Sequence, residues 1–271
     1  TLTILISQSG ETADTLAALR KAKQNNIDTL GIINTVGSSI AREALNVFYI
    51  KVGCEVSVAT TKAYSAQVLI LMLIALSIAS KKGIINEEIA NKYLNDIKKI
   101  PSLITKEINN KDTYYKIANL IYNKNDVFFL GRGIDYYLCM EASLKLKEIS
   151  YIHSESYAAG ELKHGTISLI SEGIPVIGLV TNHDLAMKSI SNIKEVKARG
   201  AFVIFVTLDS IYEEYKNDDF YDEVITVEDI SSFTSPLLVM TIFQLFAYKV
   251  AYLRGEAIDK PRNLAKSVTV E

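Results

Sequence analysis

The sequence has few cysteines, no excess of either charge and no apolar run long enough to cross a membrane. Its 271 residues include two cysteines, Cys54 and Cys139, which are far apart and match neither a disulfide framework nor a zinc-site spacing. The 29 basic residues nearly balance the 31 acidic ones, which excludes a strong field that would recruit nucleic acid or anionic lipid. The longest apolar run, residues 68–79, is shorter than the roughly 20 residues of a bilayer span and predicts a buried helix.

What remains is the composition of a folded globular protein. Hydrophobic residues make up 49% of the chain and charged residues 22%, which excludes disorder. The length suits one large domain or two smaller ones, because domains usually have about 100–200 residues. Neither a signal peptide nor an initiator Met is visible, and residues 1–6 already resemble a strand. We therefore expect a cytoplasmic protein with a further N-terminal portion upstream of this sequence.

Short β-branched runs alternate with helix-like stretches, and the pattern occurs twice. The predicted strands are residues 2–7, 29–34, 47–50, 127–130, 175–181, 202–208 and 223–227. The predicted helices are residues 13–25, 39–44, 61–80, 87–98, 111–122, 134–149, 184–199 and 237–254. Such alternation predicts an α/β fold with parallel sheets flanked by helices, in two halves that join near Pro101. Residues after Gly255 show no periodicity and either dock as a tail or stay disordered.

The first chemical motif is the hydroxyl-rich loop of residues 7–12, Ser-Gln-Ser-Gly-Glu-Thr, between a predicted strand and a helix. Gly10 permits a tight turn, and Ser9 or Thr12 can cap the helix. A helix N-terminus with hydroxyl groups beside it can bind an anion, and ligands of parallel sheets bind at the carboxyl ends of strands. The loop lacks the lysine and spacing of a P-loop. Phosphate binding and ordinary capping both remain open.

The second motif lies on the predicted helix 134–149. Glu141, Lys145 and Glu148 are spaced i, i+4, i+7 and share one face. This spacing is typical of a surface ion-pair ladder. It equally fits a carboxylate base beside a lysine, an arrangement suited to proton abstraction next to a carbonyl.

Two further candidates are single residues in irregular segments. His164, one of only three histidines, lies in the glycine-containing stretch 157–165 and is either structural or a proton shuttle. Lys266 lies in the C-terminal tail, which either frays or docks. A docked, desolvated Lys266 would be able to form a Schiff base with a ketone.

Four motifs together resemble those of the glutamine–fructose-6-phosphate aminotransferases (isomerising), the glucosamine-6-phosphate synthases. They occur in the same order, and the resemblance runs from Leu2 to Glu271. The four are Ser-Gln-Ser-Gly-Glu-Thr (7–12), Lys-Leu-Lys-Glu-Ile-Ser-Tyr-Ile-His (145–153), Gly-Glu-Leu-Lys-His-Gly (160–165) and Pro-Arg-Asn-Leu-Ala-Lys-Ser-Val-Thr-Val-Glu (261–271).

The resemblance implies two sugar isomerase (SIS) domains, each a parallel sheet wrapped by helices. We expect a first SIS domain at 1–100, incomplete at its N-terminus, a second at 101–254, and a tail at 255–271 that closes the active site. The family also implies a glutaminase domain in the full-length chain and a homodimer in the cytoplasm. It implies no cofactor, no metal, no nucleic acid and no membrane.

The implied reaction converts fructose 6-phosphate and glutamine-derived ammonia to glucosamine 6-phosphate, the first step of hexosamine biosynthesis. By resemblance, Glu148 moves a proton between C1 and C2 with Lys145 beside it, His164 assists ring opening from the partner subunit, and Lys266 forms a Schiff base at C2. The sugar phosphate is held by residues carried over from two loops and the tail: Ser7, Gln8, Ser9, Thr12, Val58, Thr60 and Ala265.

Three segments depart from the pattern common in this family. Thr60 replaces a usual serine, Thr166 a usual proline, and Glu141-Ala142-Ser143 the usual Glu-Gly-Ala. None removes a proposed catalytic group. Two alternatives remain open: a non-catalytic SIS module that binds a sugar phosphate, and an SIS-family deglycase or aldose–ketose isomerase.

Overall fold

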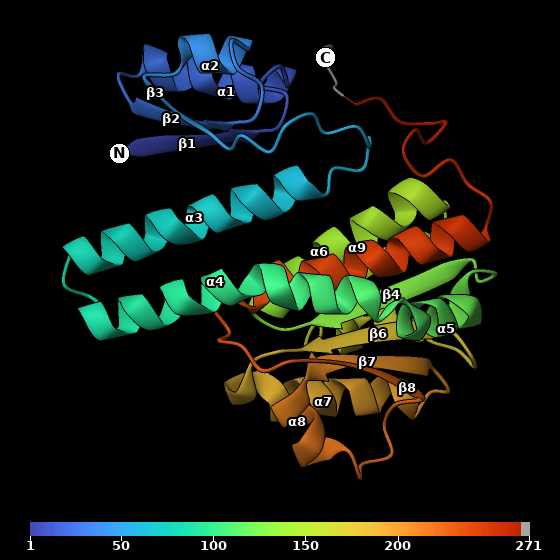
Figure 1. Ribbon diagram of the computed structural model, residues 1–271. Helices are drawn as coiled ribbons and strands as arrows, with labels where there is room; N and C mark the ends of the chain where they lie inside the picture. Colours follow the sequence, from blue (N-terminus) through green and yellow to red (C-terminus); the bar gives the residue numbers. More distant parts are fainter. Residues whose placement is uncertain (267–271) are drawn as a thin grey trace. The chain divides into compact units, whose positions relative to one another are not determined.

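The computed structural model describes residues 1–266, and the chain forms two compact units (Figure 1). The first unit contains Thr1–Ile85 and the segment from Asp259 onward, and the second contains Asn86–Ile258. The boundary expected at residue 100 falls inside helix α4 (Glu87–Asn109), which continues through Pro101 and belongs to the second unit.

The first unit has a parallel sheet in the order β1-β2-β3, formed by β1 (Leu2–Ser7), β2 (Asp28–Ile33) and β3 (Asn46–Tyr49). The helices of this unit are α1 (Ala13–Gln24), α2 (Ser39–Glu43) and α3 (Lys62–Lys81). A small core of Leu5, Leu19, Ile33 and Ile40 joins the sheet to α1 and α2. Burying these side chains stabilises the unit by about 2 kcal/mol per residue.

The second unit has a five-stranded parallel sheet in the order β5-β4-β6-β7-β8. Its strands are β4 (Asp126–Gly131), β5 (His153–Ala158), β6 (Pro175–Val180), β7 (Phe202–Leu208) and β8 (Glu223–Val227). Its helices are α4, α5 (Lys111–Ile121), α6 (Ile134–Ser150), α7 (His183–Lys197), α8 (Asp209–Tyr215) and α9 (Ser235–Leu253). Two 3₁₀ helices, η1 (Leu162–His164) and η2 (Thr166–Leu169), follow β5.

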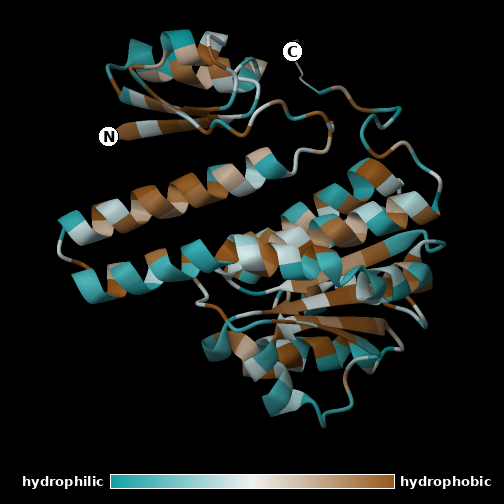
Figure 2. Ribbon diagram, viewed as in Figure 1, coloured by the Kyte–Doolittle hydropathy of each residue, from teal (hydrophilic) through white to brown (hydrophobic). Residues whose placement is uncertain are grey.

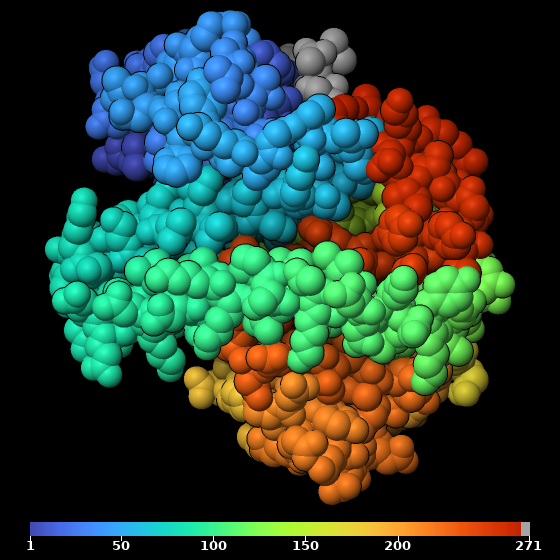
Figure 3. All heavy atoms as spheres, viewed as in Figure 1, coloured from blue at the N-terminus to red at the C-terminus, as the bar shows by residue number. Residues whose placement is uncertain are grey.

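The helices of the second unit cover both faces of this sheet. Figure 1 shows α6 and α9 above the strands and α7 and α8 below them, and α5 packs against α9. The strands β6 and β7 are buried along almost their whole length, as expected for a parallel sheet covered on both faces (Figure 2). Helix α9 packs against α4, α5 and α6, and in the space-filling view α4 runs across the surface of the unit (Figure 3).

Most predicted elements are present, and three differ from the prediction. The polar strand β5 and the short helix α8 were not predicted, and α4 extends beyond its predicted end at residue 98. Strand β5 has the sequence His-Ser-Glu-Ser-Tyr-Ala and pairs only with β4, so it lies at the sheet edge. An edge strand needs no continuous apolar run, which is why hydrophobic periodicity failed to find it.

Helices α3 and α9 are long and apolar enough, by length and composition, to cross a membrane. Core helices pass the same test, and 67% of the apolar window of α9 is buried inside the protein. The predicted helix at residues 68–79 is part of α3, but only 22% of the apolar window of α3 is buried, so the prediction that this helix is buried is not confirmed.

A buried carboxylate joins helix α6 to the end of strand β6. Asp135, in the first turn of α6, is 1% exposed. Its Oδ2 accepts the Thr181 backbone N–H at 2.8 Å, and its Oδ1 accepts the Thr181 hydroxyl at 2.5 Å. Burial raises the pKa of the Asp135 carboxyl to about 6, although the two hydrogen bonds from Thr181 oppose the shift.

We predict that Asp135→Ala lowers the free energy of unfolding by about 2–4 kcal/mol, because two buried donors of Thr181 lose their acceptor. Urea unfolding of the wild type, Asp135→Ala and Asp184→Asn measures this. Asp184 is exposed in the first turn of α7, and its replacement serves as the matched charge control. Equal loss in both variants would contradict the prediction.

The same carboxyl predicts a pH dependence. Its pKa is about 6 in the folded state and 3.8 in the reference state, so between these values the folded state binds more protons. The stability of the wild type relative to Asp135→Asn should therefore decline as pH rises from about 4 to about 6. Unfolding at pH 4, 5, 6 and 7 tests the sign, and an advantage that grows with pH would refute it.

Candidate active site

The hydroxyl-rich loop follows the carboxyl end of β1 and leads into α1. Ser7 is 7% exposed, and its Oγ accepts the Gly10 backbone N–H at 2.9 Å and lies 3.2 Å from Thr12 Oγ1. Ser9 Oγ accepts the Glu11 backbone N–H at 3.2 Å. The Gln8 carbonyl oxygen accepts backbone N–H groups from the segment after β2. The loop therefore places three hydroxyl groups beside the N-terminus of α1, where an anion is stabilised.

Gly10 is required by this turn for two reasons. Its φ is +69°, which L side chains rarely adopt, and a Cβ there would lie 2.0 Å from Ser38 Oγ. The neighbouring Glu11 faces away from the hydroxyls, because its Oε1 accepts the Ser39 backbone N–H at 2.8 Å. Hydrogen bonds from the Ser39 side chain and backbone lower the pKa of the Glu11 carboxyl, so the carboxylate is held at the start of α2.

The ladder on α6 is a half-buried cluster, and the surface-ladder interpretation does not describe it. The side chain of Lys145 is only 6% exposed and lies between two carboxylates. Its Nζ is 2.5 Å from Glu148 Oε2 and 3.5 Å from Glu141 Oε1. The exposed fractions of the Glu148 and Glu141 side chains are 20% and 16%. A buried ammonium of this kind needs such partners, because desolvation of an unpaired charge is costly.

The two carboxylates differ in their environment. Burial raises the pKa of Glu141, although Lys145 opposes the shift. Glu148 is the closer partner of the lysine, and both carboxylates are partly exposed. A carboxylate beside an ammonium can take a proton from a carbon next to a carbonyl while the ammonium stabilises the developing oxyanion.

The C-terminal segment contacts the loop that precedes α3. The Val58 backbone N–H donates to the Asp259 carbonyl oxygen at 3.0 Å, and Lys266 Nζ donates to the Ser57 carbonyl oxygen. The side chain of Lys266 is half-buried. Lys266 is thus held next to the predicted sugar-contact residues Val58 and Thr60. Residues 267–271 of the predicted tail lie outside the described residues.

The remaining predicted groups are exposed. His164 ends η1 and is exposed, and in the part of the chain that the structure describes no hydrogen bond or ion pair joins it to Lys145 or Glu148. Ala265 is exposed beside Lys266. The hydroxyl loop, Val58, Thr60 and Lys266 belong to the first unit, and Lys145, Glu148 and His164 to the second.

Glu55 is a polar residue of the first unit that sequence reasoning missed. It is 7% exposed, and its Oε2 accepts the Ala63 backbone N–H at 2.9 Å at the start of α3. The carboxylate therefore caps the helix that follows the Val58–Thr60 loop. Since the usual capping position is directly before a helix, a glutamate eight residues from its partner leaves no local signature.

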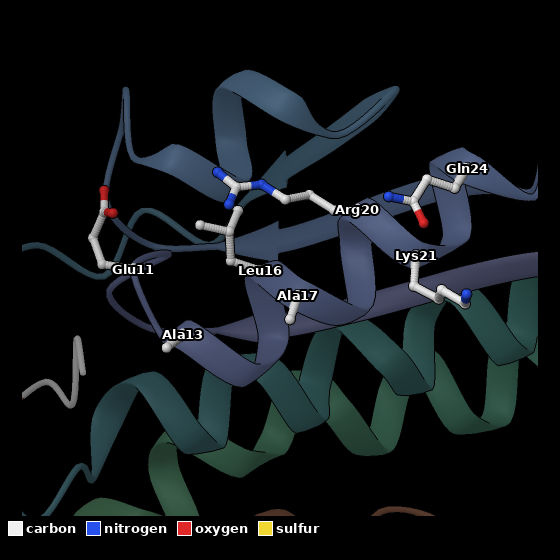
Figure 4. A pocket seen from close by; sticks show the side chains of 7 residues that line it. All are labelled: Glu11, Ala13, Leu16, Ala17, Arg20, Lys21 and Gln24. Carbon is white, nitrogen blue, oxygen red and sulfur yellow. The ribbon is translucent and has the colours of Figure 1, made fainter. Parts of the chain in front are cut away.

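An open hollow of about 630 Å³ runs along α1 (Figure 4). It is lined by Glu11, Ala13, Leu16, Ala17, Arg20, Lys21 and Gln24. Of residues 7–12, Glu11 is in this lining but none of the hydroxyl side chains is, so the hollow is not formed by the predicted phosphate-binding hydroxyls.

Comparison with known proteins identifies the family of this chain. The model of the SIS domain family matches residues 1–77 and 120–254. The glutamine–fructose-6-phosphate aminotransferase (isomerizing) of Caldanaerobacter subterraneus subsp. tengcongensis is 49% identical over 270 residues, and that of Clostridium tetani is 49% identical over 272. Both alignments cover 100% of this chain but 44% of the relative, so the chain spans less than half the length of these proteins.

Solved structures agree. The C-terminal domain of glucosamine-fructose-6-phosphate aminotransferase from Francisella tularensis is 38% identical, with a TM-score of 0.91 over 96% of this chain and 72% of that one. The glucosamine-6-phosphate deaminase of Thermotoga maritima, 24% identical with a TM-score of 0.72 over 98% of this chain and 75% of that one, shares the fold. The chain therefore belongs to the SIS domain family and, within it, to the glutamine–fructose-6-phosphate aminotransferases, whose C-terminal isomerase portion it matches.

Proposed function

We propose that this chain performs the isomerase half of glucosamine 6-phosphate synthesis, in which fructose 6-phosphate and ammonia give glucosamine 6-phosphate and water. The observation that carries the proposal is the Lys145–Glu148 pair at 2.5 Å on α6, a half-buried carboxylate beside a buried ammonium. Ammonia would come from glutamine through a glutaminase domain of the full-length protein. The setting is the cytoplasm, the pathway hexosamine biosynthesis and the assembly a homodimer.

The phosphate group binds first and orients the sugar. The hydroxyls of Ser7, Ser9 and Thr12 donate to its oxygens, together with the amides at the start of α1, and the segment of Gln8 shapes the loop. Val58, Thr60 and Ala265 line the sugar. Binding energy from this unreactive end holds the reacting carbons in place, which lowers the entropic part of the barrier.

Covalent capture follows ring opening. His164 moves the proton that releases the open-chain ketone, and Lys266 Nζ attacks C2 with loss of water to form an iminium. Ammonia then adds to C2 and Lys266 leaves as the free amine, so nitrogen replaces the carbonyl oxygen. The Ser57 carbonyl oxygen accepts one N–H of Lys266 and orients the amine beside the Val58–Thr60 loop.

The final step moves one proton between neighbouring carbons. Glu148 removes a proton from C1 of the ketose imine and returns it to C2, while the O1 hydroxyl proton passes to the imine nitrogen, which yields an aldehyde at C1 and an amine at C2. Lys145 donates to the oxygen on which charge develops and remains paired with Glu141.

Lys266 is tested by trapping. With fructose 6-phosphate and borohydride, the intact protein should form a reduced sugar-phosphate adduct at Lys266, located by peptide mass mapping. Lys266→Ala should form none, whereas Lys260→Ala, which changes an exposed lysine in the same segment, should be labelled like the wild type. An adduct of equal yield in Lys266→Ala would refute the Schiff-base step.

Glu148 is tested by proton exchange. Glu148→Gln should slow the incorporation of solvent deuterium into the sugar by a factor of about 10²–10⁴, because the amide cannot accept the C1 proton. Glu141→Gln is the matched control, since it changes the other carboxylate next to Lys145 and should retain most of the exchange. NMR in D₂O measures both. Equal losses in the two variants would assign the proton transfer elsewhere.

The alternatives give different results in the same experiments. A non-catalytic binding module would protect the hydroxyl loop in the presence of fructose 6-phosphate but produce neither adduct nor deuterium exchange. A deglycase or aldose–ketose isomerase would exchange deuterium yet form no glucosamine 6-phosphate from ammonia.

A further inference from the structure

His164 lies in the turn of residues 159–164, which follows β5 and is fixed to the rest of the second unit at two points. The Ala159 backbone N–H donates to the Gly131 carbonyl oxygen at 2.9 Å, which joins the turn to the end of β4. Leu162, in η1, is 2% exposed and anchors the turn in the core. His164 itself is exposed and follows Leu162 by two residues, so its position depends on how firmly the segment that leads to it is held.

A third contact comes from a side chain on another element. Arg132 follows β4, and its guanidinium packs directly on Gly160: a methyl group added at Gly160 would lie 2.8 Å from Nη2 and 3.4 Å from Cζ of Arg132. The same Nη2 donates to Asn192 Oδ1 on α7 at 2.8 Å. Asn192 is 7% exposed and in turn donates to Glu195. Arg132 thus joins the turn to α7.

This arrangement leaves one nitrogen of the Arg132 guanidinium group without a hydrogen-bond partner among the described residues. Arg132 Nε is buried and has no hydrogen-bond partner in the part of the chain that the structure describes. An unpaired buried donor of this kind calls for an explanation. The orientation that places the guanidinium against Gly160 and points Nη2 at Asn192 supplies one. A lysine at this position would keep the charge but lack the planar fork.

Gly160 has no conformational need to be glycine, because its φ lies outside the left-handed range. Its missing side chain is explained by the close approach of Arg132. Alanine at Gly160 therefore fits the backbone and displaces the guanidinium, which makes it a specific probe of the contact.

We propose that Arg132 is a positioning residue, which holds the turn at Gly160 and thereby places the His164 imidazole for ring opening. The inference rests on the proposed function for the role of His164, but the contact itself is independent of it. Arg132 acts through the turn and touches no reacting atom.

The chemical test uses two substrates that differ only in ring closure. 5-Deoxyfructose 6-phosphate lacks the hydroxyl that closes the furanose ring, so it needs no ring opening. Arg132→Lys and Gly160→Ala should lower kcat/KM for fructose 6-phosphate by about 10-fold or more, since small misplacements of a catalytic group are costly. With the 5-deoxy substrate both variants should match the wild type. His164→Ala should likewise lower kcat/KM for fructose 6-phosphate and leave kcat/KM for the 5-deoxy substrate unchanged.

The matched control is Arg199→Lys. Arg199 is exposed and donates to the Glu195 carbonyl oxygen of α7, and among the described residues no hydrogen bond or ion pair joins Arg199 to the turn. Its replacement should leave both substrates unaffected. Equal loss with both substrates in Arg132→Lys and Gly160→Ala would reduce Arg132 to a general structural role and overturn the proposal.

Hydrogen exchange tests the contact without any turnover. The Glu161 and His164 amides donate to the Ala158 and Glu161 carbonyl oxygens at 2.8 and 3.0 Å. In Arg132→Lys and Gly160→Ala these amides should exchange about 10-fold faster or more, while those of β6 stay unchanged. Unchanged exchange in the turn would overturn the proposal. If the wild type turns over neither substrate, the proposed function fails, and exchange still decides whether Arg132 holds the turn.

Discussion

The burial of Lys145 on α6 is the interaction on which the candidate chemistry depends. An ammonium with a side chain only 6% exposed is stable in the folded protein because Glu148 and Glu141 flank it. These partners lie one turn away on either side, so the helix alone supplies the geometry. The packing of α6 against β4, β5 and α9 then decides which side of the helix is desolvated. Structure and reactivity therefore share one requirement, the compensation of a buried charge.

The two units have the same order of elements, but the polar groups after the corresponding strands β1 and β6 make different hydrogen bonds. The order β1-α1-β2-α2-β3-α3 in the first unit recurs as β6-α7-β7-α8-β8-α9 in the second. After β1, hydroxyl oxygens accept backbone amides of their own loop. After β6, Thr181 instead donates both its amide and its hydroxyl to the buried Asp135 carboxylate. A carboxylate of the protein already occupies these donors in the second unit, which is consistent with sugar-phosphate binding at the first.

Much of this was predictable because the signals are local. The strands of a doubly covered parallel sheet are short apolar runs, and the hydroxyl loop with Gly10 is continuous in sequence. The i, i+3 and i+4 spacing of Glu141, Lys145 and Glu148 likewise placed them on one face. What periodicity alone left undecided was whether that face is exposed, because burial depends on α9, which begins almost 90 residues later.

The interactions that escaped prediction join distant residues. The Asp135–Thr181 hydrogen bonds span 46 residues, and neither partner belongs to a recognisable motif. The edge strand β5 is polar, and the Arg132–Gly160 contact exists only once β4 and the turn after β5 lie side by side. The family resemblance predicted a role for Lys266 in the sugar site. The spacing of the tail residues alone gave no reason to expect the contact of Lys266 with the loop before α3.

The contact between Lys266 and Ser57 spans 209 residues and sets an order of events during synthesis. The second unit, Asn86–Ile258, lies entirely between the two parts of the first. A ribosome adding roughly 5–20 residues per second releases the second unit before the segment that completes the first. The second unit is therefore free to fold before the segment from Asp259 onward joins the first unit. An interrupted polypeptide would hold the hydroxyl loop and the Lys145–Glu148 pair but lack Lys266, so under the proposed mechanism it would form no Schiff base.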